Sequence, residues 1–265
     1  TALDLEVKGR LPEDLSGLFA RNSANPRFEP QGRYHWFDGD GMIHGVHFDR
    51  GRAHYRNRYI RTPQLQAEED AGKALWSGIL EPLDLSNPLG PMKDTANTDL
   101  VYHNGQLLAL WWLSGQPQAI SVPDLETLGP ARFGGQLRHS VAAHSKVDPR
   151  TGDLAFFGFS VSRRPWYHFG AISADGSRVH AVDLDLPNCH IPHDIAITEN
   201  FTLLLDLPLG WDRAALKHGK HRIAFDRETP GRIGVVPRWG QADEVRWFEI
   251  PACYVYHTIS AHEHG

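Results

Sequence analysis

Short apolar runs closed by turn residues recur along the chain, whereas long helical periodicity is rare. The runs lie at residues 34–48, 100–112, 146–159 and 171–184. The turn residues within them are Asp38 to Gly41, Asn104-Gly105, Thr151-Gly152 and Asp175-Gly176. Asn-Gly and Asp-Gly pairs reach the positive φ angles that tight reversals require. Each run is therefore predicted to form a β-hairpin.

The hairpins recur about every 45–50 residues, which is the length of a four-stranded propeller blade. Proline and glycine are spread throughout the chain, and no internal boundary is visible. We therefore predict an all-β fold in a single domain over residues 1–265, with a propeller favoured over a sandwich.

Two segments favour helix. Residues 63–75 begin with a proline and carry acidic residues in their first half, which is typical of a helix N-terminus. Residues 211–218 form a shorter candidate. Residues 211–234 are rich in Lys, Arg and Gly and show few strand signals, so they are predicted to be a long insertion between strands.

The composition is that of a globular protein, with 41% hydrophobic and 22% charged residues. The net charge of −5 and the absence of a Lys/Arg cluster argue against nucleic-acid binding. Cys189 and Cys253 make no disulfide framework, which favours a reduced, cytoplasmic setting. No run approaches the ~20 apolar residues of a membrane span.

Histidine is unusually frequent, with 16 residues, and three of them share a context. His144, His193 and His257 each follow a short apolar or small-residue run and precede a turn or strand. They are separated by 49 and 64 residues, close to one blade each, with the presumed insertion in the longer gap. Equivalent strands of successive blades line a propeller axis, so residues one blade apart converge there. Neutral imidazole suits iron, copper, zinc and nickel, and the three residues are therefore candidate metal ligands.

A structural interpretation competes with this one, because a single histidine at a strand end is usually a hydrogen-bonded group of the fold. We assign that role to His103, His139, His168, His180, His218 and His221. His35, His44 and His47 are interpreted as structural or cavity-lining. His190 is the rival of His193. Residues three apart in an extended segment face opposite sides, so His190 and His193 cannot both bind one metal, and Asp194 should point away from His193.

Several motifs, in this order, resemble those of the carotenoid cleavage oxygenases. They include GLFARNSANPRF, YHWFDGDGMIH, NTDLVYHNGQLLAL, AHSKVDPRTGDLAFFGF and PHDIAITENF. The resemblance implies a seven-bladed propeller, of which roughly the first four blades are present here. It also implies a non-haem Fe(II) held by four histidines, and cleavage of an alkene C=C bond by O2 into two carbonyl products.

Within this resemblance, His144, His193 and His257 match three of the iron ligands, although Ser260 stands where the family usually has Asn. The fourth ligand has no match, since His262 and His264 lie too close to His257. We therefore expect the chain to be a fragment, incomplete at its C-terminus and also at its N-terminus.

The strand before the first ligand departs from the family pattern. The family places there a glutamate that orients a ligand histidine, whereas this chain has Trp111 and Trp112, with no carboxylate nearby in sequence. We expect a backbone carbonyl to orient His144 instead, or the local register to differ. Stilbene-cleaving members carry a lysine in this strand, so the two tryptophans favour an apolar polyene, whose flat chain suits indole faces.

Trp111, Trp112, Phe159 and Tyr256 are candidate substrate contacts, or else ordinary core. The leading hypothesis is an Fe(II) dioxygenase acting on a carotenoid or apocarotenoid with O2. A stilbene-cleaving enzyme of the same family, a zinc hydrolase and a non-catalytic binding propeller are the alternatives.

Two further expectations concern the surface and the first hairpin. A peripheral membrane contact is expected for a protein that takes a polyene from lipid, with Leu207, Leu209, Trp211 and Leu216 as candidate apolar residues. The aspartates of the DGDG run, Asp38 and Asp40, are assigned to the fold and not to chemistry.

Overall fold

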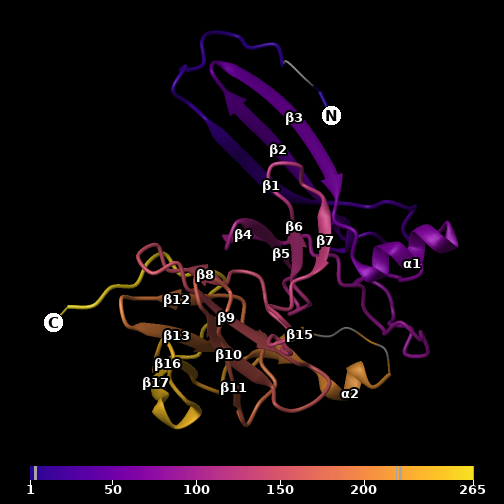
Figure 1. The fold of residues 1–265 in the computed structure, drawn as a ribbon. Coiled ribbons are helices and arrows are strands. Elements are labelled where there is room, and N and C mark those ends of the chain that lie inside the picture. The colour runs from indigo at the N-terminus through magenta and orange to yellow at the C-terminus, as the bar shows by residue number, and fades with distance from the viewer. Residues whose placement is uncertain (3–4, 219, 221–222, 265) are drawn as a thin grey trace.

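The computed structural model describes residues 1–2, 5–218, 220 and 223–264, and in these the chain is predominantly antiparallel β-sheet (Figure 1). The first sheet contains β1 (Gly17–Asn25), β2 (Asp40–Asp49) and β3 (Arg52–Tyr59). The second contains β4 (Asp99–His103), β5 (Gln106–Leu110), β6 (Gln118–Ile120) and β7 (Thr127–Pro130). The third contains β8 (Lys146–Val147), β9 (Leu154–Phe159), β10 (Tyr167–Ile172) and β11 (Val179–Leu184). The fourth contains β12 (Ile195–Ile197), β13 (Phe201–Asp206), β16 (Gly231–Pro237) and β17 (Arg246–Ile250).

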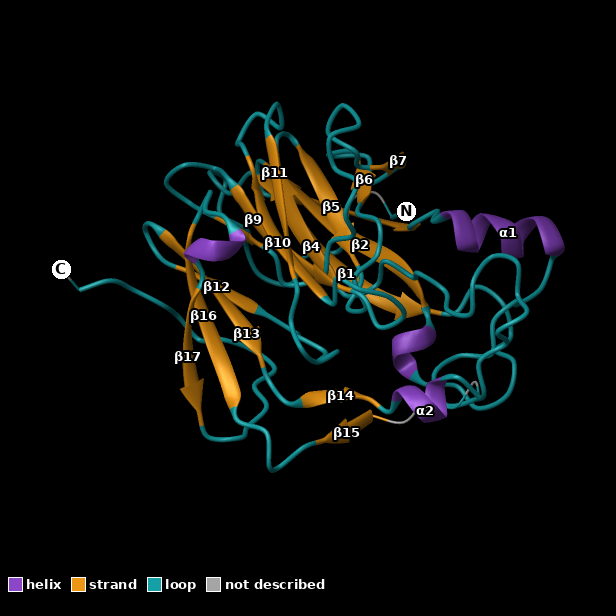
Figure 2. Ribbon diagram, turned by 90° about the horizontal axis from the view of Figure 1, so that it is seen from below, coloured by secondary structure: helices purple, strands orange, loops and turns teal. Residues whose placement is uncertain are grey.

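Few helices accompany the sheets. They are α1 (Pro63–Ala71), α2 (Arg213–Leu216) and the 3₁₀ turns η1 (Trp36–Asp38) and η2 (Ala242–Glu244). A separate ribbon pairs β14 (Leu209–Trp211) with β15 (Ile223–Phe225). The helix α1 lies at the periphery, outside the sheets (Figure 2). The prediction of a mainly β fold is thus confirmed.

Three of the four predicted hairpins are present, and the β4–β5 hairpin shows why. Asn104 and Gly105 both have positive φ, 47° and 76°, as a two-residue turn with the twist of its strands requires. The β8–β9 and β10–β11 hairpins likewise turn through Gly152 and Gly176, which have positive φ. The local signal was sufficient at these places.

The hairpin predicted at residues 34–48 is wrong. Residues 36–38 form η1, β2 pairs with β1 and β3, and the chain reverses at Arg50-Gly51 instead. The glycine of position 41 serves a close approach, because a Cβ there would lie 2.7 Å from the carbonyl oxygen of Thr95. Gly41 of the DGDG run is therefore required for close packing and does not form a hairpin turn.

The predicted helix at 63–75 is confirmed over Pro63–Ala71. The hydroxyl oxygen of Thr62 accepts the Leu65 N–H at 3.1 Å and caps its start. Gly72 has a φ of 68° and ends the helix earlier than predicted. The second helix is shorter than predicted, since α2 covers only 213–216 and Trp211 belongs to β14.

The predicted insertion at 211–234 is wrong in part. Residues 231–234 begin β16, which pairs with β13 in the fourth sheet, for example Leu204 with Gly234. The remaining described residues include α2 and β15. His221, assigned a structural role from the sequence, lies outside the described residues.

The first strands of successive sheets lie next to one another, since β4 contacts β8 and β8 contacts β12. The core lies on either side of the third sheet, whose strands β9 and β10 are buried throughout and carry Phe156, Phe157 and Phe169. The loops that precede β8 and β12 are therefore brought together on a rigid base.

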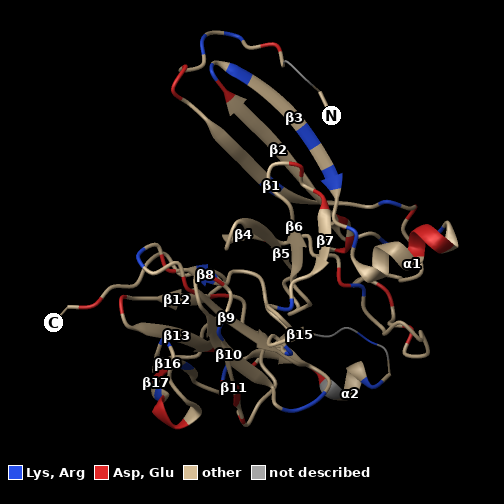
Figure 3. Cartoon of the chain, viewed as in Figure 1, with Lys and Arg blue, Asp and Glu red and all other residues tan. Residues whose placement is uncertain are grey.

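Among the described residues, no helix is both long enough and apolar enough to cross a membrane. Basic and acidic residues are interspersed over most elements, and an arginine row on β3 is the clearest exception (Figure 3). The predicted apolar face at 207–216 is wrong, because Leu207 and Trp211 are buried, and Trp211 belongs to the core around the third and fourth sheets.

Candidate metal centre

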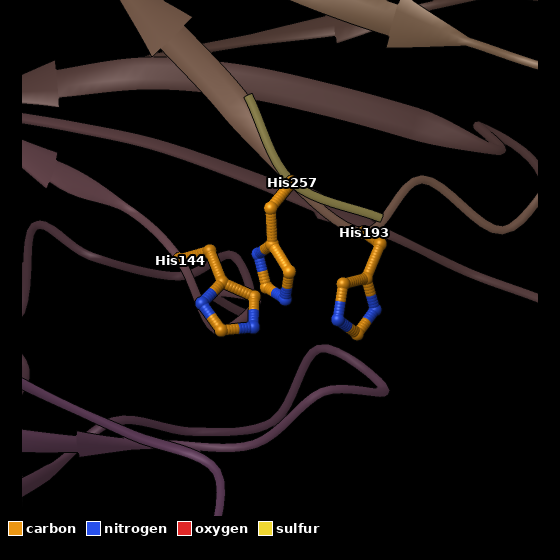
Figure 4. A group of neighbouring side chains, drawn as sticks. All are labelled: His144, His193 and His257. Atoms are coloured by element: carbon orange, nitrogen blue, oxygen red, sulfur yellow. The ribbon is translucent and has the colours of Figure 1, made fainter. Parts of the chain in front are cut away.

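Three histidines from distant segments meet at one point. The candidate ligand atoms of His144, His193 and His257 all lie within 4.8 Å of one another. Their ring centroids are 4.6–5.2 Å apart, and the rings cluster beside the ribbon in Figure 4. His144 and His193 each lie two residues before the first strand of a sheet, β8 and β12, and His257 follows β17. The structure thus brings together the three residues that the sequence selected.

The backbone at His144 is unusual, because a non-glycine residue there has a φ of 68°. Its N–H donates to the Asp99 carboxylate oxygen Oδ2 at 3.0 Å, and the preceding N–H of Ala143 donates to the carbonyl oxygen of Trp111 at 3.0 Å. These two hydrogen bonds stabilise the positive-φ conformation of His144, which is unfavourable for a residue other than glycine.

The environment of His193 keeps its imidazole neutral. Burial lowers its pKa to about 4, and the electrostatic influence of the neighbouring His144 and His257 rings acts in the same direction. A neutral ring has a free lone pair at neutral pH, as a metal ligand requires.

Two carboxylates lie beside the other two rings. Asp99 Oδ2 is 3.4 Å from His144 Nδ1, and Asp194 Oδ2 is 3.9 Å from His257 Nδ1. Burial favours protonated Asp99, but its bonds to His144 and Leu100 outweigh that effect and hold its pKa below the ordinary value. Burial likewise raises the pKa of Asp194, but the hydrogen bonds with Lys146 and Thr258 outweigh burial and hold this pKa below its ordinary value.

A carboxylate does lie beside the His144 ring, at the place where a backbone carbonyl was expected, although none is nearby in sequence. Asp99 stands directly opposite Leu110 in the β4–β5 hairpin, one strand away from the tryptophan pair. A two-residue turn at Asn104-Gly105 fixes this register, so counting outward from the turn would have found Asp99. The search in one strand missed it because the partner belongs to the neighbouring strand.

His190 is occupied by the fold. Its Nδ1 lies 2.6 Å from Asp206 Oδ1, and Arg232 Nε donates to Asp206 Oδ2 at 2.9 Å. Among the described residues, His190 is not part of the group of three. The Asp194 carboxylate accepts hydrogen bonds from Lys146, Ile195 and Thr258. Other histidines also bind within the fold: His139 with Asp183, His168 with Ser140 and His180 with Gly240.

The four candidate substrate contacts lie in different surroundings. Trp111 and Trp112 line a cavity whose wall is largely aromatic and apolar, with Phe28, Tyr34, Phe37, Trp76 and Met92. Phe159 is 3% exposed and lies in the hydrophobic core. Tyr256 is 60% exposed, and its ring centroid is 5.1 Å from that of His193.

The residues of the DGDG run make contacts within the fold. Asp38 accepts the N–H of Ile79 at 3.0 Å, and Asp40 lies 2.5 Å from the ammonium of Lys93, which also contacts Glu68. These contacts agree with the structural role assigned from the sequence.

The donor set fits a divalent transition metal. Three imidazoles supply only nitrogen, which suits iron, zinc and related ions. Two nitrogens about 2.1 Å from one ion are at most about 4.2 Å apart. Donor atoms within 4.8 Å of one another therefore need only small ring rotations to share an ion.

Comparison with known proteins places this chain in a family. The family model described as retinal pigment epithelial membrane protein matches residues 1–265. The chain is 39% identical to a carotenoid 9,10(9',10')-cleavage dioxygenase of Crocus sativus over 99% of this chain and 52% of the relative. The chain thus spans about half the length of the relatives it matches.

Solved structures agree with the sequence matches. A Pseudomonas brassicacearum lignostilbene dioxygenase superimposes with a TM-score of 0.84 at 34% identity, covering 95% of this chain and 53% of that one. A cobalt-substituted Synechocystis apocarotenoid oxygenase superimposes with a TM-score of 0.76 at 27% identity, covering 96% and 56%. The chain belongs to the retinal pigment epithelial membrane protein family, the family of the carotenoid cleavage oxygenases.

Proposed function

We propose that His144, His193 and His257 hold a non-haem Fe(II), and that the complete protein is a dioxygenase that cleaves a C=C bond of a carotenoid or apocarotenoid. The observation that carries this proposal is the convergence of three imidazole nitrogen donors from segments 49 and 64 residues apart. The Crocus relative, named a carotenoid cleavage dioxygenase, and the cobalt-substituted Synechocystis oxygenase support it.

The overall reaction balances without a further reductant. The C=C bond breaks, one oxygen atom of O2 joins each of its carbons, and two carbonyl products leave. The alkene carbons are oxidised and O2 is reduced. Iron, when bound, supplies the activation of O2.

The chain's own residues bind the ion and orient the substrate. Neutral imidazoles leave the positive charge of the ion uncompensated, which strengthens its attraction for a bound molecule. Trp111 and Trp112 offer flat faces to a conjugated chain in a cavity with aromatic, apolar and charged walls, which none of the three histidines lines. Tyr256 borders His193. Phe159 acts through packing behind the site.

The four sheets are proposed to be consecutive blades of a propeller, forming one domain over residues 1–265. Three of the four sheets have four antiparallel strands, and β4, β8 and β12 begin at residues 99, 146 and 195, close to the predicted blade length. The remaining blades of a seven-bladed ring and a fourth histidine ligand would lie outside this chain.

A phenolic stilbene is the second candidate substrate, favoured by the match to a lignostilbene dioxygenase. Trp111 and Trp112 cannot supply a cation for a phenol oxygen. Lys93 also lines the cavity, but its ammonium lies 2.5 Å from both Asp40 and Glu68 and is thereby neutralised. The polyene is therefore the leading substrate, and its extraction from lipid calls for a peripheral membrane contact at a surface other than 207–216.

Metal analysis and product analysis of the full-length protein test the proposal. We expect stoichiometric iron, two carbonyl products from an apocarotenoid, and label from ¹⁸O2 in both products. Stoichiometric zinc with alkene cleavage unaffected by iron removal would refute the dioxygenase. His193→Ala should abolish iron binding and turnover, whereas a non-catalytic binding propeller would retain its polyene affinity.

A further inference from the structure

We infer that Asp99 is the positioning residue of His144: its carboxylate holds Nδ1 of the ring and leaves Nε2 free for the metal. This inference rests on the proposed metal centre. It is carried by the contacts of Asp99, which neither the histidine pattern nor the family resemblance had selected.

Asp99 contacts the same residue at two points. Its Oδ2 accepts the backbone N–H of His144 at 3.0 Å and lies 3.4 Å from the ring nitrogen Nδ1. The first bond fixes the main chain of a residue with positive φ, and the second contact lies on the ring. One oxygen atom therefore constrains both the backbone and the side chain of His144.

The carboxylate is itself held in place. Asp99 is the first residue of β4, paired with Leu110, and its other oxygen Oδ1 accepts the N–H of Leu100 at 2.8 Å. The side chain is 30% exposed, so it is neither freely mobile nor deeply buried. A carboxylate oxygen can only accept, so a hydrogen bond across the 3.4 Å contact requires the proton on Nδ1 of His144 and leaves Nε2 unprotonated.

The second ring beside a carboxylate shows the same orientation. His257 also presents Nδ1 to an aspartate, with Asp194 Oδ2 at 3.9 Å. A ligand histidine whose second nitrogen donates to a carboxylate has a fixed tautomer and a more basic metal-binding nitrogen. Removing such a partner typically weakens metal affinity by about 10–100-fold.

A purely structural role would require only the bond to the backbone N–H, and Asp99→Asn separates the two roles. The amide oxygen of Asn can still accept the His144 N–H, but the negative charge beside Nδ1 is lost. Asp99→Ala removes both contacts. Asp183→Asn is a matched control, because Asp183 Oδ1 lies 3.1 Å from the ring of His139 outside the group of three.

The experiment titrates metal-free full-length protein with Co²⁺ and follows the visible absorption of the bound ion, while apo Tm is measured separately. We expect Asp99→Asn to weaken Co²⁺ binding by about 10–100-fold with a smaller loss of apo Tm than Asp99→Ala, and Asp183→Asn to bind like the wild type. Wild-type affinity in Asp99→Asn would overturn the inference, as would an affinity loss accompanied by the same apo Tm loss as Asp99→Ala. A wild-type protein that binds no Co²⁺, or whose binding survives His193→Ala, would instead refute the metal centre itself.

Discussion

Residues adjacent to the three histidines, more than the histidines themselves, explain why the rings meet. Lys146 follows His144 by two positions, Asp194 follows His193 directly, and Thr258 follows His257 directly. The Lys146 ammonium lies 2.6 Å from Asp194 Oδ1, while Thr258 donates its N–H and its hydroxyl to Asp194 Oδ2 at 2.8 and 2.9 Å. A single carboxylate therefore joins all three ligand segments.

Asp194→Asn should destabilise the fold by about 2 kcal/mol. Asp194 is 1% exposed, and the substitution leaves the Lys146 ammonium without a counter-charge. Lys146 is 33% exposed, so the cost should be below the ~3–5 kcal/mol of a fully buried pair. Urea denaturation measures it. Asp185→Asn, in the exposed Arg164–Asp185 pair, is the control and should cost less than about 0.5 kcal/mol. Equal effects in both variants would contradict the prediction.

Asp94 gives a pH dependence of stability whose sign is opposite to that of the paired aspartates. Burial raises its pKa from 3.8 to about 6, although the N–H groups of Ala96 and Gln116 donate to it. The folded chain binds this proton more tightly than the unfolded chain. Its contribution to stability is therefore complete below about pH 4 and is lost as the pH rises to about 6.

Comparison of the wild type with Asp94→Asn isolates the pH-dependent contribution of Asp94 to the free energy of unfolding. The stability difference between them should shift by about 3 kcal/mol against the wild type between pH 4 and pH 7, because the shift is about two pKa units. Urea midpoints at several pH values measure the change. A difference independent of pH would show that the carboxyl titrates normally in the folded state.

At the scale of elements, one position recurs in three sheets. His144 and His193 lie two residues before β8 and β12, and Asn97 occupies the same place before β4. The Asn97 amide donates to the carbonyl oxygens of Phe37 and Gly39 at 2.8 and 2.7 Å. The position two residues before a first strand thus carries a polar side chain in all three sheets, a clustered histidine in two of them and an amide bonded within the fold in the other.

The cap of α1 is a testable contribution of one element. Thr62→Ala should destabilise the protein by about 1 kcal/mol, because the N–H of Leu65 loses its acceptor in a buried place. Thr62→Ser keeps the hydroxyl and should retain most of the stability. Thermal or urea denaturation compares the two variants. Similar losses in both would assign the effect to the lost methyl group and not to the cap.

For the whole molecule, the sequence predicted what is encoded locally. The turn at Asn104-Gly105, the helix from Pro63 and the histidine group were all predicted, since backbone preference and repeat spacing determine them. The hairpin predicted at 34–48 was wrong because Gly41 is needed for close packing against the carbonyl oxygen of Thr95, which is distant in the chain, and not for a turn. Asp99 was missed for a similar reason, since its partner lies across strands. Contacts between residues distant in sequence determine the structure at 34–48 and the position of Asp99, and a local sequence pattern does not reveal such contacts.

The proposed ligands lie in three separate segments, so metal binding is expected to depend on the whole fold. Since His144, His193 and His257 belong to separate parts of the chain, the unfolded state cannot hold an ion with all three. An ion at 100 times its Kd should therefore stabilise the fold by about 2.7 kcal/mol. We expect Co²⁺ at that excess to raise the Tm of the metal-free full-length protein by about 2–3 °C, and a chelator to reverse the rise. His257→Ala should abolish it, while His139→Ala, which removes a ring outside the group, should leave it intact. A rise that persists in His257→Ala would place the ion elsewhere on the protein.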